Sequence, residues 1–204
     1  MADGGRAAAD AGADIIDINM GCPARKVTRG YSGSALMRDL DHALTLIEAT
    51  VGATRLPVTL KMRLGWDSGT MNAPELARRA EAAGVQLVTG HGRTRCQFYT
   101  GSADWAAIRT VKDAVSIPVI ANGDLCGPDE LAAMLDLSAA DGVMIGRGAY
   151  GRPWLPGHMV AFARSGAMPS SPSDAELQAI VGRHYAAIVD QYGPWVGVKV
   201  ARKH

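Results

Sequence analysis

Five short apolar runs, each ending in polar residues and followed by a helix-like segment, constrain the fold of this chain most. The first reads DIIDINMGCP at residues 14–23 and places the thiol of Cys22 where the apolar run stops. Such runs are typical of parallel strands that are buried on both faces of an α/β protein. In α/β barrels the carboxyl ends of the strands carry the chemistry. We therefore expect the loops after these runs to form the functional site.

The segments between the runs have helical features. Apolar residues recur at helical spacing from about Asp39, and residues 74–84 begin with proline and end in glycine, as helices often do. Further helices are expected at residues 105–114 and 128–135, and a helix ending at Gly12 precedes the first strand. The five strand–loop–helix units cover residues 14–150, whereas a complete eight-unit barrel takes about 250 residues. Three units would therefore be missing.

The last run, DGVMIGRGAYGRPW, indicates which units these are. Gly146 and Gly148 leave backbone N–H groups open to an anion, and Arg147 lies between them. A phosphate site after the seventh and eighth strands is a recurring feature of such barrels. We therefore predict an α/β fold of the TIM (β/α)8 type, here only about strands 4–8, with the N-terminal strands missing.

After Leu155 the strand–helix alternation stops. A Pro/Ser linker follows, and Ser173 or Asp174 is a plausible N-cap for a helix that runs to about Gln191. We predict a partial barrel at residues 1–157 and the start of a helical domain at residues 158–204, truncated at its carboxyl end.

Composition excludes several classes of protein. Hydrophobic residues make up 48% and charged residues 20% of the chain, which is typical of a globular protein. The net charge of +1 neither demands nor excludes nucleic acid. Three widely spaced cysteines argue for a reducing cytoplasm and against a disulfide framework or a zinc site. No apolar run approaches the ~20 residues that cross a bilayer, so we expect no membrane span. We also expect no bound metal, because the cysteines lack the spacing of a zinc site.

Three polar groups within or after the runs are candidates for function. Lys61 lies inside the second run, where a buried ammonium group is costly unless paired; the alternative is a lysine that reaches solvent at the strand end. His91 ends the third run and is about as consistent with a structural as with a functional histidine. The sequence Asn122-Gly123-Asp124 follows the fourth run and by itself indicates only a turn.

Taken together, the motifs resemble those of the tRNA-dihydrouridine synthases, in particular the bacterial B-type branch. The matching strings are INMGCPARKV, GSALM, VTLKMRLGW, HGRTRCQFYTG, IPVIANGD and GVMIGRGAYGRPW. The resemblance implies an FMN-dependent enzyme that reduces the C5–C6 double bond of selected uridines in tRNA, with NADPH or NADH as the reductant. It also implies a monomer in the full-length form and a carboxyl-terminal helical domain that helps to hold the tRNA.

The resemblance also implies roles for individual residues. Cys22 matches the active-site cysteine, which gives a proton to C5 of uracil as hydride from the flavin reaches C6. Asn19 matches a residue near the flavin ring and the incoming base. Lys61 and His91 match residues at the flavin ring. The residues that match contacts with the ribityl-phosphate of FMN are Asn122, Gly123, Asp124, Gly146 and Arg147.

Four basic residues are candidates for contact with tRNA phosphates, and each is equally consistent with a solvated loop charge: Arg25, Lys26, Arg93 and Arg95. Because the target uracil is stacked inside folded tRNA, we expect it to be flipped out. Gly90 departs from the β-branched residue usual in the family, which predicts a looser third strand. We also expect this chain alone, with two open sheet edges and an uncovered face, to be poorly stable and to hold FMN poorly.

Two alternatives remain open. Another FMN-dependent barrel enzyme, of the dihydroorotate dehydrogenase type, would fit the lysine and the Gly-Arg phosphate elements but not the NMGCPARKV and HGRTRCQFYTG strings. A non-catalytic RNA-binding fragment would keep the basic loops without the flavin, although the presence of Cys22, Lys61 and His91 together argues against long-standing decay.

Overall fold

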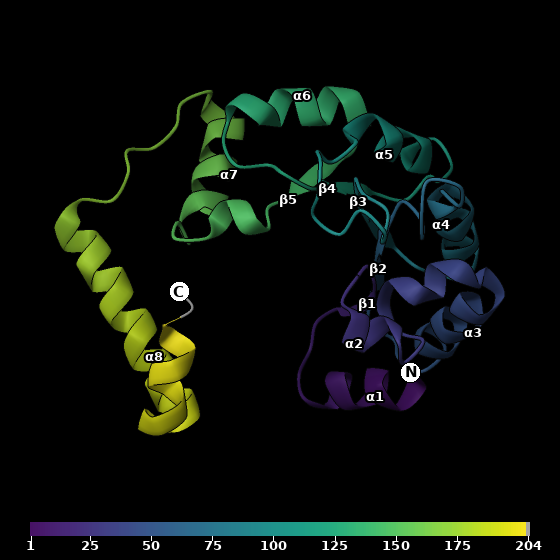
Figure 1. The fold of residues 1–204 in the computed structure, drawn as a ribbon, viewed down its shortest axis with the longest axis horizontal. Coiled ribbons are helices and arrows are strands. Elements are labelled where there is room, and N and C mark those ends of the chain that lie inside the picture. Colours follow the sequence, from purple (N-terminus) through teal and green to yellow (C-terminus); the bar gives the residue numbers. More distant parts are fainter. Residues whose placement is uncertain (203–204) are drawn as a thin grey trace. The chain divides into compact units, whose positions relative to one another are not determined.

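The computed structural model describes residues 1–202, and the last two residues of the predicted helical domain lie outside this range. The chain forms two compact units, Met1–Arg147 and Gly148–His204. In the described residues, a parallel sheet in the order β1-β2-β3-β4-β5 forms the centre of the first unit (Figure 1). Its strands are β1 (Ile16–Met20), β2 (Val58–Arg63), β3 (Leu87–His91), β4 (Val119–Asn122) and β5 (Gly142–Met144). The sheet confirms the predicted α/β class.

Helices connect the strands and line one side of the sheet, as Figure 1 shows for α3 to α6. The helical elements of the first unit are α1 (Ala2–Asp10), α2 (Arg25–Thr28), η1 (Gly33–Arg38), α3 (Leu40–Val51), α4 (Ala73–Ala82), α5 (Trp105–Lys112) and α6 (Asp129–Ser138). The short helix η2 (Arg147–Ala149) crosses the boundary between the units. The predicted helices near residues 39, 74, 105 and 128 are confirmed. The segments α2 and η1 were not predicted, because each is too short for a periodic pattern.

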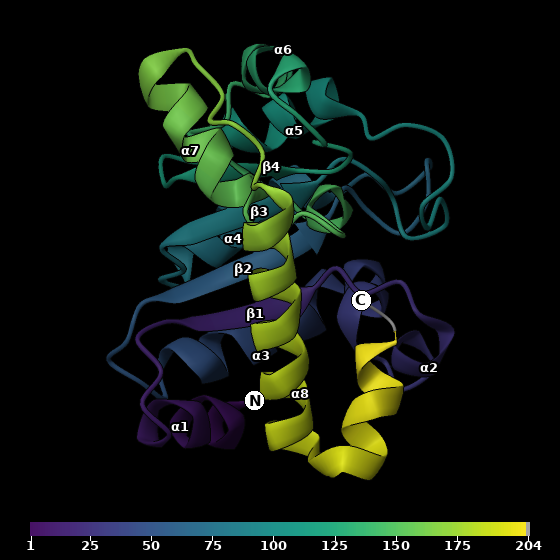
Figure 2. The same ribbon diagram turned by 90° about the vertical axis from the view of Figure 1, so that its left-hand side faces the viewer.

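The core lies between the sheet and these helices. Ile18, Leu60 and Val88, which point to the helix side, are at most 2% exposed. The first strand, predicted as a buried parallel strand, is buried on one face only: Asp17 and Asn19 are exposed, and Ile15 is 56% exposed, which agrees with the uncovered face expected for this sheet. The reason is that the helices of the first unit cover only one face of the sheet. Figure 2 shows β1 to β4 lengthwise, one above the other.

Charged side chains hold the loops at both ends of the sheet, with carboxylates at the amino ends of the strands and guanidinium groups at the carboxyl ends. At the amino ends, Glu81 accepts hydrogen bonds from the N–H groups of Ser116 and Ile117, and Asp141 accepts one from Val119 N–H at 2.7 Å. At the carboxyl ends, the guanidinium groups of Arg63 and Arg93 donate to loop carbonyls. The two arginines are the largest side chains that are nearly fully buried.

The second unit contains the helices α7 (Leu155–Ser165) and α8 (Asp174–Ala201). Ser173 is the N-cap of α8, and Glu176 completes a capping box, as the predicted helix start requires. The predicted end near Gln191 agrees with a break in α8 at Gly193, where φ is 73° and ψ is 162°, and a second helical stretch runs from this break to Ala201. The helix α7 was not predicted, because the sequence after Leu155 indicates only that the strand–helix alternation stops.

Candidate functional site

The carboxyl ends of the strands bring most of the predicted site residues to one edge of the sheet. Asn19 pairs in register with Lys61 of the neighbouring strand. Two residues further along, Arg63, His91 and Asn122 pair in one row across β2, β3 and β4. Their side chains point to the face that the helices of the first unit leave uncovered.

Lys61 is held by an oriented amide. Its Nζ donates to Asn122 Oδ1 at 3.0 Å, and Asn122 Nδ2 donates to the carbonyl of Met144 at 2.8 Å, which fixes the amide orientation. Burial and, after it, the neighbouring Arg63 lower the pKa of Lys61, while Asp17 opposes the shift. The pairing favours a functional lysine over one that reaches solvent at a strand end.

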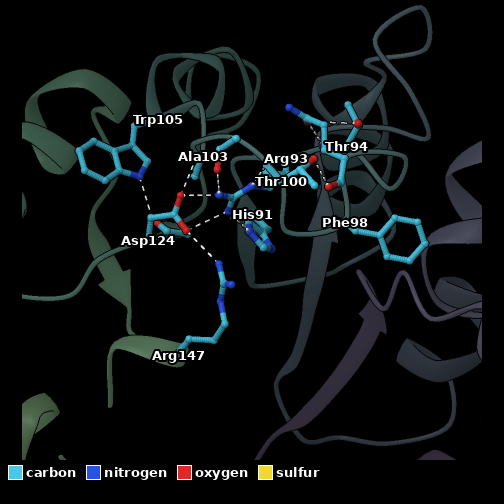
Figure 3. A network of polar contacts seen from close by, with 12 residues as sticks. His91, Arg93, Thr94, Phe98, Thr100, Ala103, Trp105, Asp124 and Arg147 are labelled. Carbon is cyan, nitrogen blue, oxygen red and sulfur yellow. Dashed lines mark hydrogen bonds and ion pairs between the residues drawn. The ribbon is translucent and has the colours of Figure 1, made fainter. Parts of the chain in front are cut away.

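A network centred on Asp124 joins the loops after β3, β4 and β5 (Figure 3). Arg93 donates to both carboxylate oxygens, at 2.9 and 2.6 Å, and also to the carbonyls of Thr100 and Gly101. Ala103 N–H donates to Asp124 Oδ2 at 2.8 Å. Burial alone would raise the pKa of Asp124, but the hydrogen bonds from Arg93 and Ala103 outweigh it and hold that pKa below its usual value.

Arg147 reaches the same carboxylate from the loop after β5. Its Nη2 lies 3.1 Å from Asp124 Oδ1, and its guanidinium stacks on Tyr99 with 4.6 Å to the ring centroid. The Arg147 side chain is 50% exposed, in contrast to 1% for Arg93. Arg93 already neutralises Asp124, so the charge of Arg147 is available to an anion from solvent.

His91 is buried in a cationic surrounding. Burial, followed by the charges of Arg63, Lys61 and Arg93, lowers the pKa of His91 to about 3, against the smaller opposite effect of Asp124. The imidazole is therefore neutral at physiological pH. Gly123 lies directly against it, with φ of 125°, and a Cβ there would come within 3.0 Å of His91 Cδ2. The glycine is required by both its backbone conformation and this close approach.

Arg63 was missed in the sequence and organises the loop that carries Cys22. Its Nε donates to the Gly21 carbonyl at 2.9 Å, and its Nη1 donates to the carbonyls of Thr94 and Phe98 at 2.7 and 2.8 Å. Because Arg63 stands two residues after Lys61 in one strand, period-two alternation could have placed both side chains on the same face.

The basic residues predicted to contact phosphates fall into two groups. Arg25 and Lys26 are exposed on α2, and Arg95, half-buried, lies near them with its Nη2 3.5 Å from Thr28 Oγ1. The Arg95 guanidinium stacks on Trp66 and Phe98 at 4.5 and 4.6 Å from their ring centroids. Arg93 is not part of this surface, since its buried guanidinium is fully engaged with the Asp124 network.

The remaining predicted residues have clear positions. Gly146 has open space around it, with no atom within 4 Å of an added Cβ. β3 continues in register through Gly90, where an added Cβ would meet Ile108 Cγ2 of α5 at 3.6 Å, an ordinary van der Waals contact. Within residues 1–202 there is no group of three or more His, Cys, Asp or Glu side chains that could hold a metal ion. Over the same residues, no helix combines the length and the apolar character needed to span a membrane.

Comparisons with known proteins agree with these motifs. The family model described as "Dihydrouridine synthase (Dus)" matches residues 1–204. The chain is 57% identical to a probable tRNA-dihydrouridine synthase of Rhodobacter capsulatus over 204 residues, which is 100% of this chain and 63% of that protein. It is 46% identical to tRNA-dihydrouridine synthase B of Pseudomonas putida, over 100% of this chain and 60% of that protein. The chain thus spans about three fifths of the length of these relatives.

Solved structures with a similar fold are distant in sequence. A putative phosphonomutase from Burkholderia cenocepacia matches with a TM-score of 0.55 at 20% identity, over 86% of this chain and 79% of that one. A dihydrodipicolinate synthase from Agrobacterium tumefaciens matches with a TM-score of 0.54 at 15% identity, over 83% of this chain and 54% of that one. Such neighbours are TIM-barrel enzymes, and at this identity they bear on the fold alone.

Proposed function

The chain belongs to the dihydrouridine synthase family, and we propose that it carries the FMN site of a B-type tRNA-dihydrouridine synthase. By this proposal the protein reduces the C5–C6 double bond of selected uridines in tRNA, with NADPH or NADH as the reductant. The observation that carries the proposal is the convergence of Cys22, Lys61, His91, Asn122 and Arg147 at the carboxyl ends of five parallel strands.

The groups at this edge fit FMN, which combines a polar ring with an anionic phosphate. The pKa of His91 is lowered by three nearby positive charges, those of Lys61, Arg63 and Arg93, and raised by one negative charge, that of Asp124. The electrostatic potential at this edge is therefore positive. Arg147, half exposed, and the open backbone at Gly146 suit a phosphate. Lys61 suits the ring edge that gains negative charge on reduction. When bound, FMN supplies the hydride.

The residues of the chain supply position and a proton. The Cys22 thiol gives a proton to C5 of the uracil, and its loop is held by Asn19 and Arg63. His91, kept neutral, offers a hydrogen bond without adding a further positive charge. Asn122 orients Lys61, and Gly123 lets the loop after β4 lie against His91. The target uracil leaves its stack in the tRNA to reach these groups.

The arrangement of the longer protein follows from the same proposal. The five strands correspond to strands 4–8 of an eight-stranded barrel, residues 1–157 form the barrel part, and residues 158–204 begin a helical domain that contacts tRNA. The exposed Arg25 and Lys26, together with Arg95, contact tRNA phosphates, whereas Arg93 supports the site from within. The full-length form acts as a monomer. Its place of action is the cytoplasm, in keeping with the three widely spaced cysteines of this chain.

Two measurements on the purified protein test this function. The visible absorption spectrum, with and without added FMN, reports whether flavin binds at about one per chain. Mass spectrometry of digested tRNA, after incubation with FMN and NADPH, reports dihydrouridine. The replacement Cys22→Ala should keep the flavin spectrum but slow dihydrouridine formation by at least about 100-fold, because a positioned acid contributes that much. Reduction of free pyrimidines with no response to tRNA would contradict the proposal and favour a dihydroorotate-type enzyme.

A further inference from the structure

The backbone around Cys22 is held from three sides. Asn19 Oδ1 accepts hydrogen bonds from the N–H groups of Gly21 and Cys22, at 3.0 and 3.2 Å. Arg63 Nε donates to the Gly21 carbonyl at 2.9 Å. The third contact reaches the carbonyl of Cys22 itself and comes from Ser34, twelve residues further along the chain. The backbone of Cys22 is thus fixed at its N–H group, on one side of the Cα atom, and at its carbonyl group, on the other.

Ser34 makes this third contact twice. Its backbone N–H donates to the Cys22 carbonyl at 3.0 Å, and its Oγ donates to the same oxygen at 2.8 Å. Ser34 is 0% exposed, so no water competes for its hydroxyl group. A buried hydroxyl is costly to leave unpaired, and here its donor capacity is used on one carbonyl oxygen. Ser34 therefore fixes the direction in which the Cys22 peptide points.

Gly33 provides the space for this contact. Its φ is 59°, and a Cβ at this position would lie 2.8 Å from the Cys22 carbonyl oxygen and 3.1 Å from Cys22 Cβ. Any larger residue would therefore push on the very atoms that Ser34 holds. Gly33 and Ser34 are the first two residues of η1 and of the GSALM string in the sequence. The proposed function assigns no role to this string.

We propose that Ser34 is a positioning residue for the Cys22 thiol and that Gly33 is the glycine this contact requires. The inference rests on the proposed function, in which the thiol must deliver a proton to one carbon atom. Proton transfer requires a donor held at hydrogen-bond reach, and a shift of about 1 Å can cost about 100-fold in rate. Asn19 and Arg63 hold the residues before Cys22, and Ser34 closes the loop after it.

The first test is the alkylation of Cys22 by iodoacetamide, followed peptide by peptide with mass spectrometry. In Ser34→Ala we expect Cys22 to react about fivefold faster, as the loss of one ordinary hydrogen bond implies, while exposed Cys96 keeps its rate. The matched control is Ser138→Ala, since Ser138 is also 0% exposed and its Oγ donates to the Met134 carbonyl within α6. It should leave both rates unchanged.

Gly33→Ala should act more strongly than Ser34→Ala on Cys22. Its matched control is Gly166→Ala, because Gly166 has a similar φ of 73° but no atom within 4 Å of an added Cβ. Both place an alanine at a similar positive φ, so a difference between them reports the push of the added Cβ on Cys22 and on Val27, whose Cγ1 would lie 3.0 Å from it. If Gly33→Ala does not fold, Ser34→Ala remains the deciding variant, since its backbone contact to Cys22 is unchanged.

The second test separates the kinetic constants for tRNA. In Ser34→Ala, kcat should fall about tenfold while KM for tRNA stays within about twofold, because the thiol and not the binding surface is displaced. Equal acceleration of Cys22 and Cys96 alkylation would overturn the proposal, and so would unchanged alkylation of Cys22 or an unchanged kcat. If the unaltered protein forms no dihydrouridine, the proposed function fails, and the alkylation rates still decide whether Ser34 holds Cys22.

Discussion

Arg93 donates two hydrogen bonds to the carboxylate of Asp124, at 2.9 and 2.6 Å, from a side chain that is only 1% exposed. The pair joins the loop after β3 to the loop after β4, and Arg147 reaches it from the loop after β5. Three loops that carry proposed FMN contacts therefore depend on one carboxylate.

Replacing Asp124 by Asn should destabilise the fold, because it leaves the buried guanidinium of Arg93 without a counter-charge. We expect a loss of about 3 kcal/mol in the free energy of unfolding, the lower end for a broken buried pair, as Asp124 itself is partly exposed. Urea unfolding measures it. The control Asp141→Asn, in the more exposed pair with Lys112, should cost less than about 1 kcal/mol. Equal losses in the two variants would contradict a special role for the Arg93 pair.

His91 should give the fold a pH dependence between its two pKa values. The pKa of His91 is about 3 in the folded protein and rises to the ordinary 6.5 on unfolding, so the unfolded chain binds the extra proton between these values. Stability should therefore decrease as pH falls from about 6.5, by at most about 1.4 kcal/mol per pH unit. Unfolding in urea from pH 7 to pH 4.5 measures this slope. In His91→Gln the slope should become smaller, and an identical slope would exclude His91 as its source.

Lys61 should give FMN binding a dependence on alkaline pH. The pKa of Lys61 is lowered from 10.5, so its positive charge, present below that pKa, is lost at a lower pH than for an exposed lysine. We expect FMN affinity to fall as pH rises through this range. In Lys61→Arg, whose guanidinium stays charged, the fall should be absent. Fluorescence titration with FMN measures both.

A replacement that removes the charge of Lys61 tests its proposed contact with FMN at neutral pH. Lys61→Met should weaken FMN binding about tenfold at neutral pH, the usual effect of losing a hydrogen bond to a charged group. Lys112→Met is the control, since Lys112 lies on α5 and pairs with Asp141 at 2.8 Å. Unaltered FMN affinity in Lys61→Met would rule out contact with the flavin.

The basic surface of α2 should determine the salt dependence of tRNA binding. Each phosphate contact contributes about one unit to the slope of log affinity against log salt concentration. The double replacement Arg25→Gln with Lys26→Gln should therefore lower this slope by about two, as filter binding at several salt concentrations would show. Arg78→Gln is the control, because Arg78 lies on α4 and pairs with Glu75. A slope that the double replacement leaves intact would place the tRNA elsewhere.

Arg95 tests stacking separately from charge. Its guanidinium lies on the rings of Trp66 and Phe98, an arrangement that a lysine cannot reproduce. Arg95→Lys should therefore keep the salt slope of tRNA binding but loosen the loop after β3. Faster hydrogen exchange at the amides of residues 95–99 would show the loosening, and protection equal to that of the unaltered protein would speak against the stack.

The strand–helix alternation and the positions of the site residues could be predicted because they follow from local pattern. His91 and Asn122 each lie at the end of an apolar run, and such ends meet at one edge of a parallel sheet. The partners could not be predicted in the same way. Whether Arg93 faces a phosphate or a carboxylate depends on Asp124, 31 residues away, and no periodicity carries that information.

The exposed face of β1 shows a second limit. Ile15, Ile16 and Ile18 predict a buried strand, and only the count of missing barrel units predicts an uncovered face, because burial depends on which layers cover the sheet and is not a local property. Ser34 shows a third. A serine beside glycine in a loop has many uses, and its contact with the Cys22 carbonyl arises only when the loop folds back over twelve residues.

Carboxylates hold the amino ends of the strands, whereas the proposed chemistry takes place at the carboxyl ends. Heat resistance and activity therefore depend on different residues. Glu81 and Asp141 hold the segments before β4 and β5, whereas Cys22 and Lys61 belong to the opposite end of the sheet. Substitutions at the amino ends can therefore change the melting temperature without moving the thiol. A lineage that enters a warmer or colder habitat could adjust this protein at one end of its sheet while the reaction at the other end stays the same.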